Sequence, residues 1–179
     1  MRKIVVSQFI SLNGVMEAPE IWNSNYRDNK EVVKEILNDF SVSDALLFGR
    51  TTYEQFASRW PQRTDEMAGY FNALPKYVVS TSMQNAEWRH STVINADVYD
   101  AVQQLKQQPG KNILLFGSHR LVQALMAHQL IDEYKLYVYP LTLGAGKRLF
   151  TEESAPLTMK LVSARSLTGG VVSLTYQSQ

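Results

Sequence analysis

Two apolar segments of this chain each end at a glycine and lead directly into a helical pattern. Residues 45–48 are followed by Gly49, and residues 113–116 are followed by Gly117. A strand that ends in glycine before a helix leaves free backbone N–H groups at the positive end of the helix dipole. Because glycine lets an anion come close to the backbone, such a turn binds phosphate readily. Two of these turns predict a ligand with phosphates at separate points, such as a dinucleotide.

The residues around each glycine add groups that suit phosphate. After Gly49, Arg50 offers a bidentate guanidinium, and Thr51 and Thr52 offer hydroxyls. Either turn taken alone is also consistent with an ordinary strand-to-helix connection. Neither has the spaced glycines of a dinucleotide fingerprint or the lysine of a P-loop. The second turn is predicted to bind the cofactor through Gly117, Ser118, His119, Arg120 and Leu121.

Six further side chains are candidates, and each has a structural alternative. Ser80, Thr81 and Ser82 follow an apolar run and could hydrogen-bond a ribose phosphate, or they could lie in a solvated loop. Trp22 and Tyr26 could stack on a flat substrate, or they could cover the edge of the core. Asp28 is the one carboxylate that we nominate to handle a proton, and it could instead cap the helix that follows.

Composition excludes several classes of protein and site. The 18 basic and 17 acidic side chains nearly balance, which argues against a nucleic-acid binder that depends on general phosphate attraction. The chain has no cysteine, and its three histidines lack the spacing of a zinc site, so no metal is expected. No window approaches the roughly 18 apolar residues that span a bilayer, and the first apolar run is too short for a signal peptide. We therefore expect a cytoplasmic protein that does not bind membranes.

The elements that must position these residues form an alternating α/β pattern. We expect strands at residues 3–10, 45–48, 77–79, 92–94 and 112–116, and helices at 28–40, from 51, at 66–74, after 95 and after 118. Strands dominate from residue 134, with Gly169 and Gly170 turning a hairpin between 159–162 and 171–176. The pattern predicts one domain, residues 1–179, with a mostly parallel sheet finished by antiparallel strands at one edge. The helix caps that we expect are Asp28 with Glu31, Thr51 with Glu54, Asn95, and Ser118.

Three stretches of the sequence resemble a known superfamily. They are residues 11–15 (SLNGV), 47–53 (LFGRTTY) and 116–150, which begins with FGSHRL and ends with PLTLGAGKRLF. The chain resembles the dihydrofolate reductase-like superfamily, and within it the branch that includes the reductase domain of riboflavin biosynthesis. The resemblance covers essentially the whole chain. It implies a three-layer sandwich with an eight-stranded, mainly parallel sheet, helices on both faces, and NADPH lying across the strand ends.

The resemblance also implies roles for individual residues. Ser80 and Thr81 would lie near the adenosine ribose phosphate, and Asn13 and Gly14 would lie beside the nicotinamide and the substrate. Asn13 stands where riboflavin-pathway reductases usually carry aspartate, and no arginine follows the serine–threonine pair. A serine after the glycine at 117 replaces the paired glycines of dihydrofolate reductases. The cofactor phosphates would be held by Gly49, Arg50, Thr51, Thr52, Gly117 and Ser118.

The implied chemistry is hydride transfer, which demands little of side chains because the cofactor carries the reaction. We expect Gly14 to let the first loop close over the nicotinamide, Trp22 and Tyr26 to wall the substrate cavity, and Asp28 to assist protonation. The expected function is NADPH-dependent reduction of a small pyrimidine- or pterin-like substrate, most like 5-amino-6-(5-phosphoribosylamino)uracil reductase. A dihydrofolate reductase proper and a nucleotide-binding protein without turnover stay open as alternatives. Reductase domains of this branch are often dimers, so a homodimer is expected as well.

Overall fold

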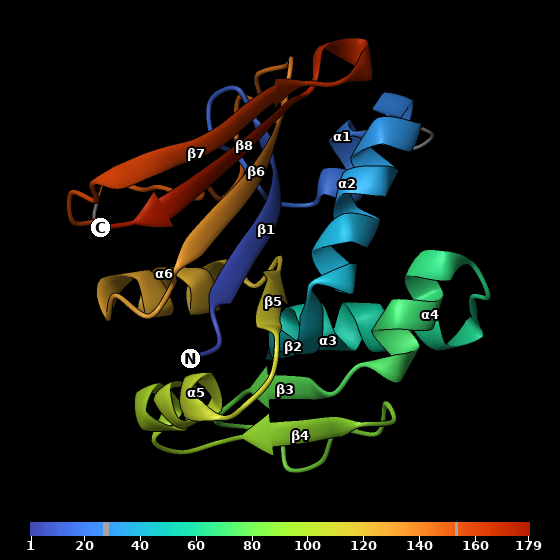
Figure 1. Ribbon diagram of the computed structural model, residues 1–179. Coiled ribbons are helices and arrows are strands. Elements are labelled where there is room, and N and C mark those ends of the chain that lie inside the picture. Colours follow the sequence, from blue (N-terminus) through green and yellow to red (C-terminus); the bar gives the residue numbers. More distant parts are fainter. Residues whose placement is uncertain (27–28, 153) are drawn as a thin grey trace.

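The computed structural model describes residues 1–26, 29–152 and 154–179 and contains one eight-stranded sheet (Figure 1). Asp28 lies outside the described residues. The strand order is β4-β3-β2-β5-β1-β6-β8-β7. The first six strands in this order are parallel, while β8 pairs antiparallel with β6 and β7 antiparallel with β8. The strands are β1 (Ile4–Ser11), β2 (Ser43–Gly49), β3 (Lys76–Val79), β4 (Ser91–Ile94), β5 (Asn112–Phe116), β6 (Glu133–Tyr139), β7 (Met159–Ser166) and β8 (Val172–Ser178).

Helices cover both faces of this sheet, which confirms the predicted three-layer α/β architecture. The helices α2 (Lys30–Ser41), α3 (Arg50–Ala57) and α4 (Glu66–Ala73) pack on one face, and α5 (Val98–Gln107) and α6 (His119–Ala127) pack on the other (Figure 1). The short helical segments are α1 (Pro19–Trp22), η1 (Ser24–Tyr26), η2 (Trp60–Gln62) and η3 (Thr168–Gly170). The last of these turns the predicted hairpin between β7 and β8.

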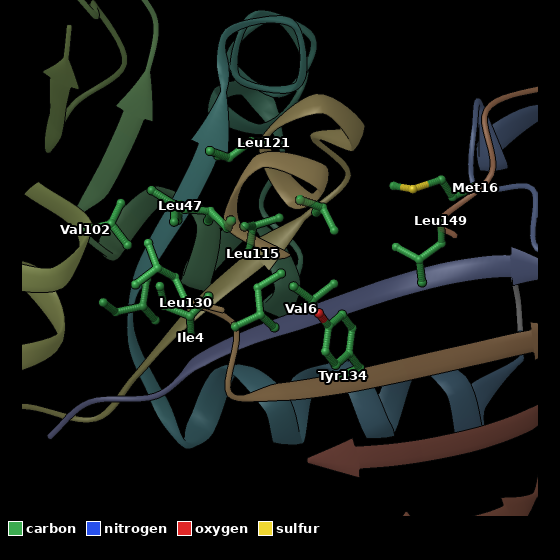
Figure 2. Close-up of a cluster of buried hydrophobic side chains, with 14 of the residues drawn as sticks. Ile4, Val6, Met16, Leu47, Val102, Leu115, Leu121, Leu130, Tyr134 and Leu149 are labelled. Carbon is green, nitrogen blue, oxygen red and sulfur yellow. The ribbon is translucent and has the colours of Figure 1, made fainter. Parts of the chain in front are cut away.

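The central strands are apolar throughout because helices bury them on both sides. In β2, Ala45 and Leu47 face the layer of α5 and α6, whereas Leu46 and Phe48 face the layer of α2, α3 and α4. All four side chains are buried. Figure 2 shows the first of these two cores, in which Leu47 lies among side chains of β1, β5, α5 and α6.

One polar cluster interrupts the core on the α2 face. The carboxylate of Asp39, at the end of α2, pairs with Lys135 and accepts hydrogen bonds from the Tyr137 hydroxyl at 2.9 Å and the Ser7 hydroxyl at 3.2 Å. Burial raises the pKa of the Asp39 carboxyl, and Lys135 and the two hydroxyls oppose that rise. Because each buried polar group has a partner, the cluster fixes α2 across β1 and β6.

The start of α2 differs from the prediction. Asn29 is its N-cap, and the Asn29 side chain accepts from the backbone N–H groups of Glu31 and Val32, both at 3.2 Å. The Glu31 carboxylate accepts from the backbone and hydroxyl of Thr168, in a turn 137 residues away. The N-cap is thus Asn29 in place of the expected Asp28, and the predicted pairing of Asp28 with Glu31 involves a residue outside the described ones.

Two other predicted caps are also wrong. In α3 the Glu54 carboxylate accepts from Arg50 Nε at 2.7 Å, and the N-cap position is Gly49 with no side-chain cap. An i,i+4 ion pair thus replaces the predicted Thr51–Glu54 capping box. The N-cap of α5 is Asp97 rather than Asn95, with a left-handed φ of 46° and no capping hydrogen bond.

Candidate functional site

The two glycine turns lie at the same edge of the sheet and contact each other. They follow β2 and β5, which are neighbouring parallel strands. The backbone N–H of Gly49 donates to the Ser118 hydroxyl at 2.9 Å, and the backbone N–H of Ser118 donates to the Thr52 hydroxyl at 2.8 Å. Ser118 occupies the predicted N-cap position of α6, but it makes no side-chain capping hydrogen bond, because its hydroxyl is bonded to the other turn. The two turns form a single hydrogen-bonded unit.

Gly117 sits in this unit at a position that favours glycine. Its φ is +55°, and an added Cβ would lie 3.0 Å from Oγ1 and 3.1 Å from Cγ2 of Thr52. The carboxamide of Gln8, in β1, donates to the Gly117 carbonyl at 2.8 Å and accepts from its N–H at 3.2 Å. Sequence reasoning missed Gln8, although a glutamine inside an apolar strand is an unusual residue that could have been singled out.

Both helices that leave this unit begin without a side-chain cap. The first-turn N–H groups of α3 and α6 have no partner within their own helix, and the dipoles of both helices present positive ends here. Leu121 is buried and packs toward Gly49, while Arg120 is exposed. The candidate donors at this edge are therefore mainly backbone amides, and two helix termini supply them at one place.

Arg50 extends from this unit toward the loop that follows β3. Its Nη1 donates to the Ser82 hydroxyl at 2.7 Å while its Nε holds Glu54. In the same loop, buried Ser80 accepts from the backbone N–H of Met83 at 3.0 Å, and Thr81 is exposed. The structure thus brings the predicted Arg50 together with the predicted Ser80–Thr81–Ser82 segment, through the hydroxyl of Ser82.

Asn13 fastens the first loop, residues 12–18, to a second loop, residues 141–149. Oδ1 of Asn13 accepts from the Ser11 hydroxyl at 2.7 Å and from the Leu143 N–H at 3.1 Å, and Nδ2 donates to the Leu143 carbonyl at 2.7 Å. The Gly14 carbonyl accepts from Leu149 N at 2.9 Å. Figure 2 shows Met16 and Leu149, one from each loop, in the same apolar cluster. The two loops therefore behave as one layer over the end of β1.

His119 joins this layer to the second glycine turn. One ring nitrogen, Nε2, lies 2.9 Å from the Arg148 carbonyl. The other, Nδ1, is buried and has no hydrogen-bond partner in the part of the chain that the structure describes. A buried nitrogen without a partner calls for an explanation, and a bound ligand could supply the missing group.

A cavity of about 360 Å³ opens beside Trp22, between α1 and the second loop. Trp22 Nε1 donates to the Glu17 carbonyl at 2.8 Å, which fixes the ring at the wall. The Glu17 carboxylate also lines the cavity and pairs with Lys147 at 2.5 Å, and the hydrogen bond from Lys147 lowers the pKa of Glu17. An ionised carboxylate beside an aromatic wall can accept N–H groups from a flat ring. Sequence reasoning missed Glu17, because only the fold places this acid beside the tryptophan.

The two predicted stacking residues have different environments. Trp22 and Tyr26 both pack edge-on against Tyr139, with ring centroids 5.4 and 5.1 Å apart. Trp22 also lines the cavity, whereas Tyr26 is absent from its lining. Tyr26 therefore covers the edge of the core, which was the structural alternative, and Trp22 covers the core and walls the cavity.

The part of the chain that the structure describes contains neither a candidate metal site nor a membrane-spanning helix. Within residues 1–26, 29–152 and 154–179, no three acidic or histidine side chains gather in a way that could hold a metal ion. The same residues include no helix with the length and apolar character needed to cross a membrane.

Comparison with known proteins identifies relatives over the whole chain. Residues 2–173 match the RibD C-terminal domain family. The uncharacterized protein YyaP of Bacillus subtilis (strain 168) is 31% identical over 187 residues, which cover 98% of this chain and 94% of YyaP. Among solved structures, a protein of Shewanella sp. PV-4 that is named for riboflavin biosynthesis has a TM-score of 0.75 at 22% identity. The match covers 100% of this chain and 99% of the Shewanella chain. The deaminase/5-amino-6-(5-phosphoribosylamino)uracil reductase of Thermotoga maritima has a TM-score of 0.69 at 14% identity, with 99% of this chain and 57% of that chain covered. The dihydrofolate reductase-like fold is confirmed.

Proposed function

The chain belongs to the RibD C-terminal domain family, and from this premise we propose that it is an NADPH-dependent reductase of a pyrimidine- or pterin-like ring. The reaction would be most like that of 5-amino-6-(5-phosphoribosylamino)uracil reductase, the activity for which the Thermotoga maritima protein is named. One observation carries the proposal, namely the hydrogen bonds that join the Gly49 and Gly117 turns at neighbouring strand ends. They bring two uncapped helix N-termini to one place.

The joined turns suit the pyrophosphate of a dinucleotide. We assign its oxygens to the first-turn N–H groups of α3 and α6, because backbone amides at a helix N-terminus bind anions without a counter-charge. Thr51 and Thr52 supply hydroxyls on the α3 side, and Ser118 holds the two turns in register.

We assign the 2′-phosphate of NADPH to the surface between Arg50 and the loop after β3. The guanidinium already lies 2.7 Å from the Ser82 hydroxyl, next to Ser80 and Thr81. A guanidinium and neighbouring hydroxyls are the groups that recognise a phosphate monoester. NADH carries no phosphate at this position, so the arrangement favours NADPH over NADH.

The substrate is assigned to the cavity beside Trp22, at the far end of the proposed dinucleotide. NADPH, when bound, supplies the hydride. The ionised Glu17 would accept N–H groups of the ring, the indole of Trp22 would exclude water, and Asn13 and Gly14 would shape the wall nearest the nicotinamide. Asp28 remains our candidate for the proton, as predicted from the sequence.

The test is a thermal melt with NADPH, followed by a turnover assay. A ligand at 100 times its Kd stabilises the native state by about 2.7 kcal/mol, which raises the Tm of a chain of this length by roughly 5–10 °C. An unchanged Tm at millimolar NADPH would refute the proposal. Oxidation of NADPH with dihydrofolate alone would identify a dihydrofolate reductase, and a rise in Tm without oxidation across pyrimidines and pterins would identify a binding protein.

The expected homodimer is kept as part of the proposal. The edge strand β7 carries Leu161 and Val162, which are each about half exposed, 50% and 51%. An exposed apolar edge strand is a ready surface for pairing with a second copy. Light scattering coupled to size exclusion tests this expectation, and a monomer at all concentrations would contradict it.

A further inference from the structure

A second cavity, of about 620 Å³, lies away from the proposed cofactor edge. Its lining includes Ala57, at the end of α3, and Trp88 and Arg89, just before β4 begins. The helix α3 starts at the carboxyl edge of the parallel strands and runs to the opposite edge, where β4 starts. The cavity is therefore distinct from the glycine turns and from the cavity beside Trp22.

Two arginines line this cavity, and both are held by Nε. Arg63 Nε donates to Asp65 Oδ2 at 2.8 Å, and its guanidinium carbon lies 4.5 Å from the centre of the Trp60 ring. Arg89 Nε donates to the Asn72 carbonyl at 3.1 Å. The terminal nitrogens of both guanidinium groups have no hydrogen bond or ion pair among the described residues. Both guanidinium groups therefore keep their terminal donors available for a ligand.

The floor between the arginines is rigid. The side chain of Asn72 donates to the Trp60 carbonyl at 2.9 Å and accepts from Trp88 Nε1 at 2.9 Å. The backbone N–H of Trp88 donates to the Tyr53 hydroxyl, also at 2.9 Å. With both atoms of the amide engaged, Asn72 links the backbone of Trp60 to the indole of Trp88, the residues next to which the two arginines lie.

The charge around the floor is net positive. Lys76 is fully buried below Trp88, with Nζ 4.5 Å from the ring centre, and it donates to two backbone carbonyls rather than to a carboxylate. Burial, and then the charge of Arg89, lower the pKa of Lys76 to about 8. The cations around the cavity are thus Arg63, Arg89 and Lys76. The carboxylates are two, Asp65, which pairs with Arg63, and Glu87 in the lining.

We propose that this cavity binds a phosphate-bearing anion, held between the terminal nitrogens of Arg63 and Arg89. Phosphate matches the donors because a guanidinium offers paired N–H groups to two of its oxygens. The volume admits either free phosphate or the phosphate of a small organic ester. The proposal is independent of the reductase activity and of NADPH.

The experiment uses the tryptophans as reporters. The chain has three, of which Trp60 and Trp88 contact the arginines or line the cavity, so Trp22→Phe leaves only these two. The Trp22→Phe variant is titrated with inorganic phosphate, pyrophosphate and adenosine monophosphate, and sodium chloride keeps the ionic strength constant. We expect a saturable fluorescence change in the millimolar range or below. Saturation by inorganic phosphate indicates a free anion, and saturation by the nucleotide alone indicates an ester.

Matched variants locate the binding. Arg89→Gln and Arg63→Gln should each weaken it roughly tenfold or more, the factor expected for loss of a charge-assisted hydrogen bond. Arg59→Gln, which removes an exposed arginine after α3, and Arg50→Gln, at the cofactor edge, should leave it unchanged. Circular dichroism melts check that each variant folds, and Arg89→Lys, which retains the charge, should bind more weakly than the parent. No saturable change, or the same affinity in Arg89→Gln and Arg59→Gln, overturns the proposal.

Discussion

The strongest prediction concerns Gly117→Ala, because this glycine holds the two turns together. A left-handed φ costs an alanine about 1–2 kcal/mol. The new Cβ would also lie 3.0 and 3.1 Å from the Thr52 side chain, and such overpacking costs about 1–3 kcal/mol. The lower entropy of the unfolded alanine chain offsets roughly 0.4–1 kcal/mol. We expect a net loss of about 1–5 kcal/mol, which corresponds to a Tm lower by roughly 2–20 °C.

The same substitution should weaken NADPH binding. To relieve the contact, Thr52 or Gly117 must move, and either motion lengthens the 2.8 Å hydrogen bond from Ser118 N to Thr52. The two helix N-termini then separate, so we expect NADPH to bind at least roughly tenfold more weakly, a change of about 1.4 kcal/mol. Thermal melts with and without NADPH measure both effects.

Two further variants, a control and a rescue, test whether the contact with Thr52 causes these losses. Gly144→Ala is the control, because that glycine has no heavy atom within 4 Å of an added Cβ and no positive φ. Thr52→Ser in the Gly117→Ala background removes the methyl contact but retains the hydroxyl, so it should restore part of the Tm. If Gly117→Ala melts and binds NADPH as Gly144→Ala does, the reasoning about the joined turns is refuted.

Three other predictions follow from single contacts. Arg50→Gln should weaken NADPH binding roughly tenfold or more and leave NADH binding unchanged, and equal losses measured by calorimetry would contradict the assignment of the 2′-phosphate. Asn13→Asp removes the donor to the Leu143 carbonyl and places a carboxylate against that carbonyl. The free energy of unfolding in urea should therefore be about 1–3 kcal/mol lower than that of the parent. An unchanged free energy would show that this contact does not fasten the loops. For Lys76, the native pKa of about 8 lies below the unfolded value of 10.5, so the native state binds fewer protons between these pH values and the free energy of unfolding should rise there by roughly 3 kcal/mol. Lys76→Met should abolish that rise, and identical pH profiles for parent and variant would show that burial does not lower the pKa of this lysine.

The sheet and the glycine turns could be predicted because their signals are local. A continuous apolar run that stops at glycine specifies both a buried strand and the turn after it, and Gly49 and Gly117 were identified from such runs alone. That their strands are neighbours is set by the strand order of the sheet, which only the structure gives. The predicted strands all appear, with ends displaced by a few residues at most, apart from β7, which extends four residues further.

The helix caps could not be predicted because distant groups compete for the same side chains. The Ser118 hydroxyl has the right position to cap α6, yet it accepts from Gly49, 69 residues away. Glu31 has the right spacing for a capping box, yet Thr168 takes its carboxylate. A local pattern shows that a polar group needs a partner, and only the packed fold decides which one it receives.

The candidate site is largely preformed, which changes the expectation for the first loop. Asn13 fixes this loop to Leu143, and the Gly14 carbonyl is already bonded to Leu149. A loop held at these points needs little ordering when a ligand arrives, so less binding free energy is lost to conformational entropy. The group that must rearrange is instead Arg50, whose exposed pairing with Glu54 is weak. Exchange of that carboxylate for a phosphate would leave the Ser82 hydrogen bond in place and neutralise the anion, and this makes Arg50 the residue on which discrimination between NADPH and NADH depends.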